Sequence, residues 1–407
     1  MTAATNSTSK KFVDLVLIEP VTAFGGTERH TIGLIQELQR KGLRIAFIES
    51  GTPLVSPRIE TNPNTLTVIT TDLSMSPGTR QELRAWNQVL DQFKADRALI
   101  IKSWNATGST KFYELLKSRF KKILTIEHTT MAARPKWSMH IHFNKRVRTG
   151  LWWYKNYYQL KKRANLVDHV ITVSNFNKLC LAENALVPEN KITVCPNGID
   201  TSFWQKDIQK SLKFRQQLDI PIDAFVFGCV GRLSPEKGFD LAINAFKNFQ
   251  KYDSARNSYL IIIGEGGMRG ELETQAQGAN GKILFTGFMS ELVPAYSAMN
   301  AGLFTTHHNK FWSGESFGLS LIEAMSCECG VIAMNKGATT ELIGNCSHIS
   351  ELLDTRDVDA WGFALNKYVS TPKDELEKRA AQLRKRVVEN YDASLTYTRL
   401  VDTIMTV

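Results

Sequence analysis

The sequence predicts an α/β protein built from two domains with parallel β-sheets. Three observations support this fold class: a length of 407 residues, a hydrophobic content of 43% with 22% charged residues, and short β-branched or aromatic runs that alternate with amphipathic stretches. Such alternation is typical of βαβ units, and a chain of this length exceeds what one hydrophobic core usually holds. We therefore expect two globular domains of about 200 residues each.

The predicted strands fall into two consecutive sets. The first set covers residues 12–18, 44–49, 66–70, 98–103, 123–126 and 169–173. The second set covers residues 225–230, 259–263, 283–286, 302–305 and 331–334. A Pro/Gly turn cluster at residues 195–200 follows the first set. We place the domain boundary there, which gives a first domain of residues 1–200.

The loops that follow strands are the most informative, because open parallel sheets bind ligands outside the carboxyl ends of their strands. Glycine-rich or polar sequences stand at these places in both domains. They cover residues 22–31, 127–130, 231–238, 264–267 and 314–325. This distribution indicates a ligand site on the carboxyl edges of the two sheets.

Two glutamates separated by seven residues, Glu315 and Glu323, bracket the start of a predicted helix. Helical side chains lean toward the N-terminus, so Glu323 in the second turn points to the end at which Glu315 lies. Between them lie the backbone N–H groups of the expected helix N-terminus, those of Phe317, Gly318 and Leu319, which can form an anion site. An anion flanked by two hydroxyl-binding carboxylates fits a sugar nucleotide. The alternative is a surface helix with two ordinary acids.

Other candidate residues also follow strands. Arg232 and Lys237 can grip phosphate oxygens and neutralise a departing diphosphate, although two solvated cations are the alternative. Gly25 and Gly26 permit close approach of the backbone to a phosphate or a sugar. His128 is the only histidine directly after a predicted strand of the first half. It can form a hydrogen bond with a sugar hydroxyl, or its carbonyl can stabilise developing positive charge. A structural histidine is the alternative.

An ordered set of short motifs runs through nearly the whole chain. It comprises Gly-Gly-Thr-Glu-Arg at 25–29, Glu-His-Thr-Thr at 127–130, Val-Ser-Asn-Phe at 173–176, Pro-Asn-Gly-Ile-Asp at 196–200, Gly-Arg-Leu-Ser-Pro-Glu-Lys-Gly at 231–238, Gly-Glu-Gly at 264–266 and Glu-x7-Glu at 315–323. The set resembles the retaining glycosyltransferases of family 4. The second half of the chain is the stronger match.

The resemblance implies the GT-B fold, in which two Rossmann-like domains face a central cleft. Residues 201–390 would form the donor domain, and residues 391–407 a helix that crosses back to the first, acceptor-binding domain. Glu315, His128, Arg232 and Lys237 would be the catalytic residues. Matching positions imply that Glu315 binds hydroxyls of the donor sugar and Glu323 binds the ribose. Arg232 and Lys237 would bind the diphosphate, and the amides of Phe317, Gly318 and Leu319 would bind a phosphate. Gly25, Gly26 and Gly264 would contact the donor, and His128 would lie beside the transferred sugar.

The expected reaction is a front-face transfer with retention, catalysed by a hexosyltransferase without a cofactor or a metal, because no Asp-x-Asp is placed to bind one. A UDP-sugar is the favoured donor and GDP-mannose is possible. The expected acceptor is a lipid-linked or cell-surface glycan, such as lipopolysaccharide or capsule. Two stretches depart from the family pattern: residues 307–314, which include His307 and His308, and residues 327–331. The alternatives are a nucleotide-sugar epimerase or a phosphorylase on this fold, or a basic module that binds RNA or membranes.

The excess positive charge lies in the first half, where residues 1–200 hold 28 Lys and Arg against 16 Asp and Glu. Residues 134–163 carry nine basic and seven aromatic residues and no acidic one. This composition suits an anionic membrane surface or a lipid-linked acceptor. A solvated face with core aromatics, or a nucleic-acid site, remain alternatives. The membrane and acceptor candidates are Lys145, Arg146, Arg148, Trp152, Trp153, Lys161, Lys162 and Arg163.

The six cysteines form no C-x-x-C pair and no cluster at zinc spacing, so we expect reduced thiols. The N-terminal residues lack an apolar signal region, and no run of about 18 apolar residues occurs. The sequence therefore predicts a cytoplasmic protein that associates peripherally with the inner face of the cell membrane.

Overall fold

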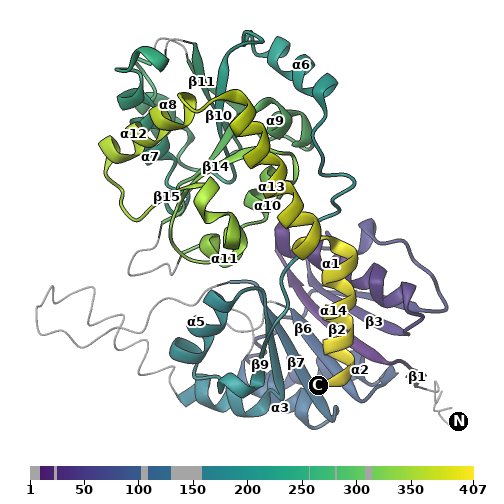
Figure 1. Cartoon of the computed structure of the whole chain (residues 1–407). Helices are drawn as coiled ribbons and strands as arrows, with labels where there is room; N and C mark the ends of the chain where they lie inside the picture. Colours follow the sequence, from purple (N-terminus) through teal and green to yellow (C-terminus); the bar gives the residue numbers. More distant parts are fainter. Residues whose placement is uncertain are drawn as a thin grey trace, which may run out of the picture. The chain divides into compact units, whose positions relative to one another are not determined.

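The chain folds into two compact units (Figure 1). The computed structural model describes residues 10–22, 25–101, 109–129, 158–255, 257–279, 282–307 and 314–407. Unit 1 comprises Met1–Pro196 and Tyr397–Val407, and unit 2 comprises Asn197–Thr396. The units divide after residues 196 and 396, where the sequence predicts divisions after residues 200 and 390.

Unit 1 contains a seven-stranded parallel sheet in the order β4-β3-β2-β6-β7-β8-β9. Its strands are β2 (Leu15–Val21), β3 (Ile45–Gly51), β4 (Leu66–Thr71), β6 (Arg97–Ile101), β7 (Lys122–Glu127), β8 (His169–Thr172) and β9 (Ile192–Val194). A separate parallel ribbon pairs β1 (Lys11–Phe12) with β5 (Phe93–Lys94). Each strand predicted for this half is present, and the short strands β1, β5 and β9 are additional.

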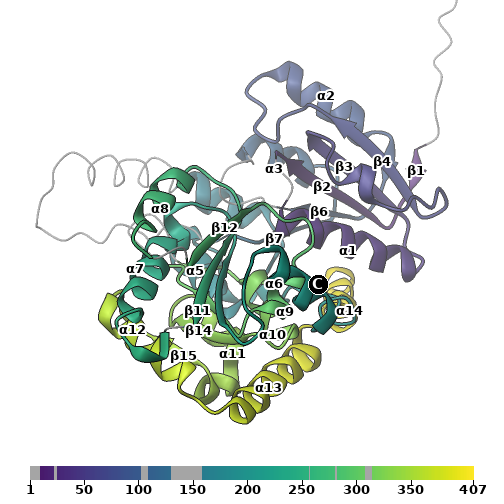
Figure 2. The same ribbon diagram turned by 90° about the horizontal axis from the view of Figure 1, so that it is seen from above.

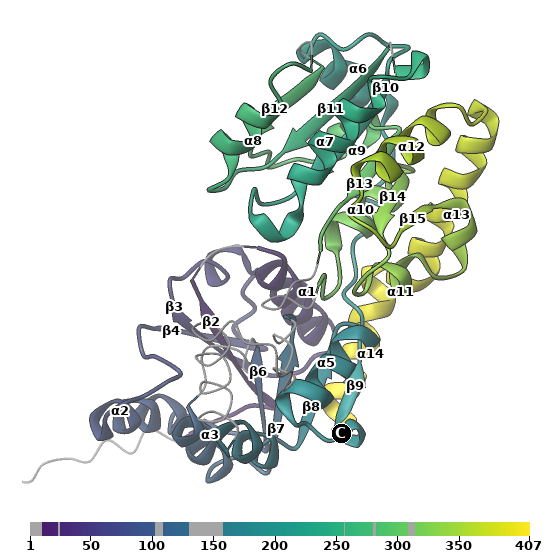
Figure 3. The ribbon, with the colours of Figure 1, turned by 90° about the vertical axis from the view of Figure 1, so that its left-hand side faces the viewer.

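Alternating apolar residues bury both faces of this sheet, as expected of a parallel sheet covered on both sides. Leu15 and Leu17 of β2 face a core that includes helices α1 (Gly26–Arg40) and α14 (Ala393–Thr406). Val16 and Ile18 face the opposite core. On that side lie α2 (Arg80–Leu90), α3 (Thr110–Lys117), the helical residues 158–166 and α5 (Asn175–Ala185). Figure 3 shows α2 and α3 well apart from α14.

Unit 2 contains a six-stranded parallel sheet in the order β12-β11-β10-β13-β14-β15. Its strands are β10 (Phe225–Val230), β11 (Ser258–Ile263), β12 (Ile283–Gly287), β13 (Ala301–Phe304), β14 (Gly330–Met334) and β15 (Glu351–Leu353). The strands predicted for the second half are all present, and β15 is additional.

Helices cover both faces of the second sheet as well (Figure 2). Phe227 and Cys229 of β10 face the core formed with α7 (Phe239–Phe249), α8 (Arg269–Gln275) and α12 (Val358–Val369). Val226 faces the opposite core, formed with α6 (Ile208–Gln217), α9 (Val293–Ala298) and α10 (Leu319–Ser326). Two further helices are α11 (Thr339–Ile343) and α13 (Lys373–Tyr391). Each unit is thus a Rossmann-like three-layer α/β structure.

The last helix, α14, begins in unit 2, and its residues from Tyr397 onward group with unit 1. Leu400, Val401 and Ile404 of this helix are buried in the core with α1. This arrangement agrees with the expected return of the chain to its first domain.

All six cysteines are buried free thiols. Within the described ranges, no helix combines the length and the apolar character that a membrane span requires.

Candidate functional site

The strand order of unit 2 has a switch point between β10 and β13, since the chain leaves β10 toward β11 and later returns to the other side of β10. Loops after the two strands at such a point diverge and leave a crevice. The loop after β10 carries Arg232 and Lys237, and the segment after β13 leads to Glu315. Three of the predicted site residues therefore stand at the place where this sheet type binds ligands.

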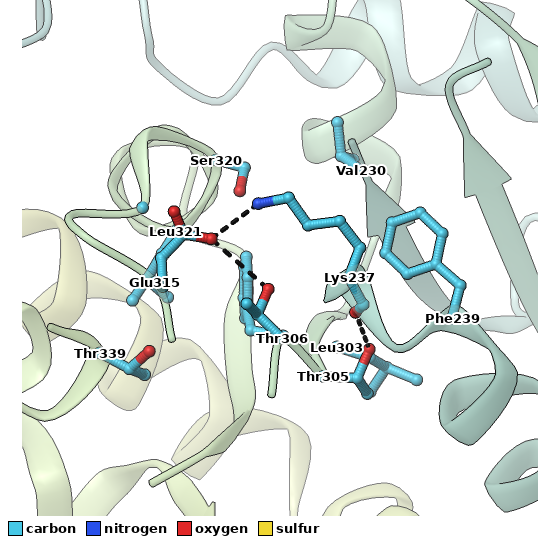
Figure 4. A pocket seen from close by; sticks show the side chains of 12 residues that line it. Val230, Lys237, Phe239, Leu303, Thr305, Thr306, Glu315, Ser320, Leu321 and Thr339 are labelled. Carbon is cyan, nitrogen blue, oxygen red and sulfur yellow. Dashed lines mark hydrogen bonds and ion pairs between the residues drawn. The ribbon is translucent and has the colours of Figure 1, made fainter. Parts of the chain in front are cut away.

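Lys237 and Glu315 are in direct contact at this point (Figure 4). The Lys237 Nζ atom lies 2.7 Å from Glu315 Oε2, and the two side chains are 25% and 24% exposed. The Thr306 hydroxyl donates to the same carboxylate oxygen at 3.4 Å. The second oxygen of Glu315, Oε1, has no recorded partner among the described residues. One carboxylate oxygen is thus fixed, while the other remains available to a hydroxyl donor.

A cavity adjoins this ion pair and holds about 390 Å³ of empty space, part of it open to solvent. Its lining combines apolar walls with hydroxyl groups and the two charged side chains (Figure 4). The polar lining residues are Lys237, Thr305, Thr306, Glu315, Ser320 and Thr339.

Hydrogen bonds to main-chain carbonyls hold the loops after β10 and β13 together. The Thr305 hydroxyl donates to the Lys237 carbonyl at 2.8 Å, and the His307 amide donates to the Glu236 carbonyl at 3.2 Å. Gly238 has φ +69°, and a Cβ there would lie 2.4 Å from the Thr305 carbonyl oxygen. Only glycine permits both this conformation and this approach. The position of Lys237 is consequently set by the neighbouring loop.

The backbone of Glu315 is held from another side. Its carbonyl accepts a hydrogen bond from the Ala338 amide at 3.0 Å. Gly337 precedes Ala338 with φ +67°, and a Cβ on Gly337 would lie 2.7 Å from the Glu315 carbonyl oxygen. Two separate segments of unit 2 therefore fix the carboxylate and the main chain of Glu315.

Helix α10 begins next to Glu315 with an uncapped N-terminus. Its N-cap Gly318 adopts φ +103° and ψ +64°, and no side chain bonds the first amides. The amides of Phe317, Gly318, Leu319 and Ser320 donate no hydrogen bond to the described part of the chain. Unpaired amides at a helix N-terminus attract anions. These are the amides for which the sequence predicts phosphate binding.

Arg232 is 69% exposed and pairs with Glu236 at 3.2 Å. Burial raises the pKa of the Glu236 carboxyl, but the Ser234 hydrogen bond and the charges of Arg232 and Lys237 outweigh it, so this pKa lies below its usual value. Glu236 is therefore ionised at neutral pH and holds the Arg232 guanidinium beside the same loop. Arg232 and Lys237 pair with different carboxylates, Glu236 and Glu315 respectively.

Glu323 is buried, with 5% of its surface exposed. Its Oε2 atom accepts a hydrogen bond from the Tyr296 hydroxyl of α9 at 3.3 Å. Burial, followed by the charge of Glu323, raises the pKa of Tyr296 well above its usual value, so this hydroxyl stays protonated and can donate. Ribose binding by Glu323 remains a prediction.

Gly264 follows β11 with φ +138°, and its amide donates to the Gly287 carbonyl at 2.9 Å. A Cβ at this position would lie 1.9 Å from the Gly231 carbonyl oxygen. The Leu233 amide also donates to the Glu265 carbonyl at 2.9 Å. The glycine thus lets the loop after β11 pack against the loop that carries Arg232 and Lys237.

The remaining predicted site residues lie in unit 1. Gly25 is the N-cap of α1 and Gly26 its first residue, and the Gly25 amide donates to Glu28 Oε2 at 2.9 Å. His128 directly follows β7, and its ring packs edge-on against His30 of α1, with the ring centroids 4.6 Å apart. The structure brings His128 together with a residue that the sequence patterns do not single out.

Only part of the basic and aromatic stretch is described. Lys161 is exposed, and Lys162 pairs with Glu114 at 2.5 Å. Arg163 is partly buried, and this burial lowers the pKa of its guanidinium. Arg163 therefore turns inward, whereas Lys161 and Lys162 lie at the surface. The candidates outside the described residues are Lys145, Arg146, Arg148, Trp152 and Trp153, together with His308 of the loop before Glu315.

Thr306, Ser320, Thr339 and His30 are absent from the predicted site. Thr306 could have been found by the rule that gave the other candidates, because it is the second residue after β13. Ser320 stands in the first turn of the predicted helix. His30 lies within the selected stretch 22–31, but its contact with His128 depends on tertiary packing. Thr339 carries no comparable signal in the sequence. Within the described ranges, no group of three or more His, Cys, Asp or Glu side chains is arranged to hold a metal ion.

Two family models match the chain over nearly its whole length. The model described as "Glycosyltransferase Family 4" matches residues 24–203, and the model described as "Glycosyl transferases group 1" matches residues 210–387. The chain belongs to glycosyltransferase family 4. The predicted family is confirmed, and the switch-point site lies within the second matched region.

Individual relatives of this family 4 chain are more distant. A probable sucrose-phosphate synthase of Thermosipho melanesiensis is 28% identical over 212 residues, which cover 50% of this chain and 44% of the relative. A GDP-mannose-dependent alpha-(1-6)-phosphatidylinositol monomannoside mannosyltransferase of Mycolicibacterium smegmatis is 27% identical over 220 residues, covering 53% and 56%. The chain spans about half the length of the curated relatives that it matches.

Solved structures match over a greater length. The crystal structure of Anabaena Alr3699/HepE in complex with UDP and glucose aligns with a TM-score of 0.75 at 17% identity, over 97% of this chain and 100% of the other. At this identity the likeness establishes the fold. The predicted GT-B class, with two Rossmann-like units, is confirmed.

Proposed function

We propose that this family 4 chain is a retaining hexosyltransferase that moves a sugar from a nucleoside diphosphate to a glycan acceptor. The observation that carries the proposal is the Lys237–Glu315 contact of 2.7 Å, next to the uncapped N-terminus of α10 at the switch point of the sheet. A cation, amides that donate no hydrogen bond within the described part of the chain, and a carboxylate that accepts the Thr306 hydroxyl therefore lie in one small region. These three groups suit the phosphates and the sugar hydroxyls of a sugar diphosphate.

In this proposal each group has one task. The Lys237 ammonium has three N–H donors and gives one to Glu315, so two remain for phosphate oxygens. The Phe317, Gly318 and Leu319 amides bind a further phosphate oxygen. Glu315 accepts a sugar hydroxyl through Oε1, because Lys237 and Thr306 hold Oε2.

The leaving diphosphate gains negative charge as the anomeric C–O bond breaks. Lys237, the α10 N-terminus and Arg232 stabilise that charge, and preorganised groups of this kind supply a large share of catalysis in such sites. A departing phosphate oxygen takes the acceptor's hydroxyl proton on the same face, which retains the configuration. Because protein groups supply the positive charge, we propose that no metal is required. Activity that is unchanged by EDTA is the expected result.

We further propose a UDP-sugar as donor, with GDP-mannose as the second candidate. The Anabaena protein, crystallised with UDP and glucose, supports the first, and the name of the Mycolicibacterium relative supports the second. The acceptor is proposed to be a lipid-linked or cell-surface glycan, as the phosphatidylinositol mannoside in that relative's name suggests. A cytoplasmic protein at the inner membrane face would meet such acceptors, and the exposed Lys161 and Lys162 suit that surface.

A panel of UDP- and GDP-sugars tests the proposal. Thermal shift identifies the donor, and mass spectrometry with glycolipid acceptors then detects transfer and NMR its anomeric configuration. Release of a free epimer without acceptor would indicate an epimerase, and a requirement for inorganic phosphate would indicate a phosphorylase. Binding to RNA or vesicles without any turnover of a nucleotide sugar would indicate a basic binding module and would contradict the proposal.

A further inference from the structure

Three aromatic side chains from different elements of unit 1 meet beside β7. His30, in the second turn of α1, packs edge-on against His128, with centroids 4.6 Å apart and ring planes at 69°. On another side His30 contacts Tyr397 of α14, with centroids 5.3 Å apart. His30 therefore lies between the C-terminal helix and the histidine that is predicted to stand beside the transferred sugar.

Folding alone does not explain a histidine at position 30. The side chain is 4% exposed, and its Nδ1 atom is buried without a hydrogen-bond partner in the described part of the chain. Burial lowers the pKa of His30 to about 3, so the ring is neutral at neutral pH. A buried polar atom without a partner destabilises a fold, and an apolar side chain of similar size would avoid that cost.

The position of the Tyr397 ring is fixed by close packing of α14 on α1. A Cβ on Gly33 would lie 2.4 Å from Tyr397 Cζ, so the ring rests on bare backbone. One residue later, the Thr398 hydroxyl donates to Glu37 Oε1 at 2.9 Å. His30 thus contacts both His128 and a Tyr397 ring that is itself held by close packing.

We propose that His30 is a positioning residue, which sets the ring orientation of His128 while Tyr397 holds His30 in place. The edge-to-face arrangement is one of the two that ring pairs prefer, so this contact favours one orientation of the His128 ring and restricts its rotation about the side-chain bonds. His128 then presents the same edge to the sugar in each turnover. This inference rests on the proposed function, because it gives His128 a role in transfer.

The variant His30→Leu separates this role from a structural one. Leucine fills the space without a polar atom, so the free energy of unfolding should stay equal or rise. We expect kcat to fall about three- to tenfold, the range that one lost aromatic edge contact produces. The donor KM should change less than kcat, because the proposed diphosphate and sugar contacts of Lys237 and Glu315 belong to unit 2. His30→Phe, which keeps a ring edge, should restore most of kcat.

His169 of β8 offers a matched control, since its ring bonds Thr193 and lies outside this cluster. His169→Leu should leave kcat unchanged. If His30→Leu does not fold, Tyr397→Leu provides a second route, because it removes the ring behind His30 and should lower kcat in the same way.

An NMR measurement keeps the test independent of activity. The protein is labelled with ¹⁵N-histidine, and the ring signal of His128 is assigned as the one that is present in the wild type and absent from the variant His128→Gln. It should shift in His30→Leu and stay in place in His169→Leu. A folded His30→Leu protein with unchanged kcat and an unchanged His128 signal overturns the inference. If wild-type protein transfers no sugar although the signal shifts, the proposed function is wrong, and with it the catalytic purpose of this contact.

Discussion

His30 should make the stability of unit 1 depend on pH. In the unfolded chain its imidazole titrates near the ordinary pKa of 6.5, and in the folded protein burial lowers that pKa to about 3. Below pH 6.5 the unfolded chain therefore binds a proton that the folded chain does not. Stability is fully present above pH 6.5 and falls as the pH is lowered toward 3. The variant His30→Leu removes this dependence.

The magnitude follows from the two pKa values. Each pH unit between them costs about 1.4 kcal/mol, so lowering the pH to about 5 should remove about 2 kcal/mol from the free energy of unfolding. Because the folded pKa lies well below pH 5, this figure depends almost entirely on the unfolded value. Hydrogen exchange measured by mass spectrometry on peptides of α1 reports on unit 1 alone. It avoids treating a two-unit chain as a single transition.

Comparing variants isolates the contribution of His30. Burial also lowers the pKa of His169, so that residue contributes in the same direction. The wild type and His169→Leu should both show the decline of about 2 kcal/mol that belongs to His30, and His30→Leu should lack it. If protection of α1 falls equally with pH in the wild type and in His30→Leu, the assignment of a buried neutral His30 is refuted.

Three further predictions concern unit 2. Glu315→Ala and Lys237→Ala should each lower kcat by about 10²- to 10³-fold with the fold intact by circular dichroism, and near-normal turnover in both would remove the proposed function. Thr306→Val deletes a hydroxyl that contacts Glu315 and should lower kcat/KM about tenfold, with donor affinity measured by calorimetry as the check. Gly238→Ala combines a left-handed φ with a Cβ 2.4 Å from a carbonyl oxygen and should destabilise unit 2 by about 2–4 kcal/mol in urea unfolding. Gly267→Ala, where a Cβ meets nothing within 4 Å, is the control and should change stability by less than about 1 kcal/mol.

The parts of the fold that the sequence predicts are those with strong local patterns. The run from Phe225 to Val230 is apolar and β-branched or aromatic, and it forms β10 with those same bounds. The strands β9 and β15 are three residues long and partly exposed at the edges of their sheets, so they carry little periodicity. Their existence depends on pairing with a neighbouring strand rather than on their own residues.

The site shows the same division. Arg232, Lys237 and Glu315 are predictable because they follow strands, and strand ends converge in a parallel sheet. Lys237 pairs with Glu315, and Arg232 pairs with Glu236. This choice of partners depends on side-chain packing, which the spacing of residues in the sequence does not predict. Glu323 is predicted to face a ligand, and its carboxylate lies against Tyr296 of another helix. Sequence patterns locate the edge of the sheet, and packing decides which groups meet there.

The division of unit 1 between the two ends of the chain has a consequence for synthesis on the ribosome. Leu400, Val401 and Ile404 cover an apolar face that is otherwise formed by residues before Pro196. The 200 residues of Asn197–Thr396 must be translated in between, which at ordinary elongation rates takes about 10–40 s. During that interval the part of this face that α14 covers in the folded protein is exposed, although α1 already covers the rest. The nascent chain is then most exposed to aggregation, and the last turns of α14 end that exposure.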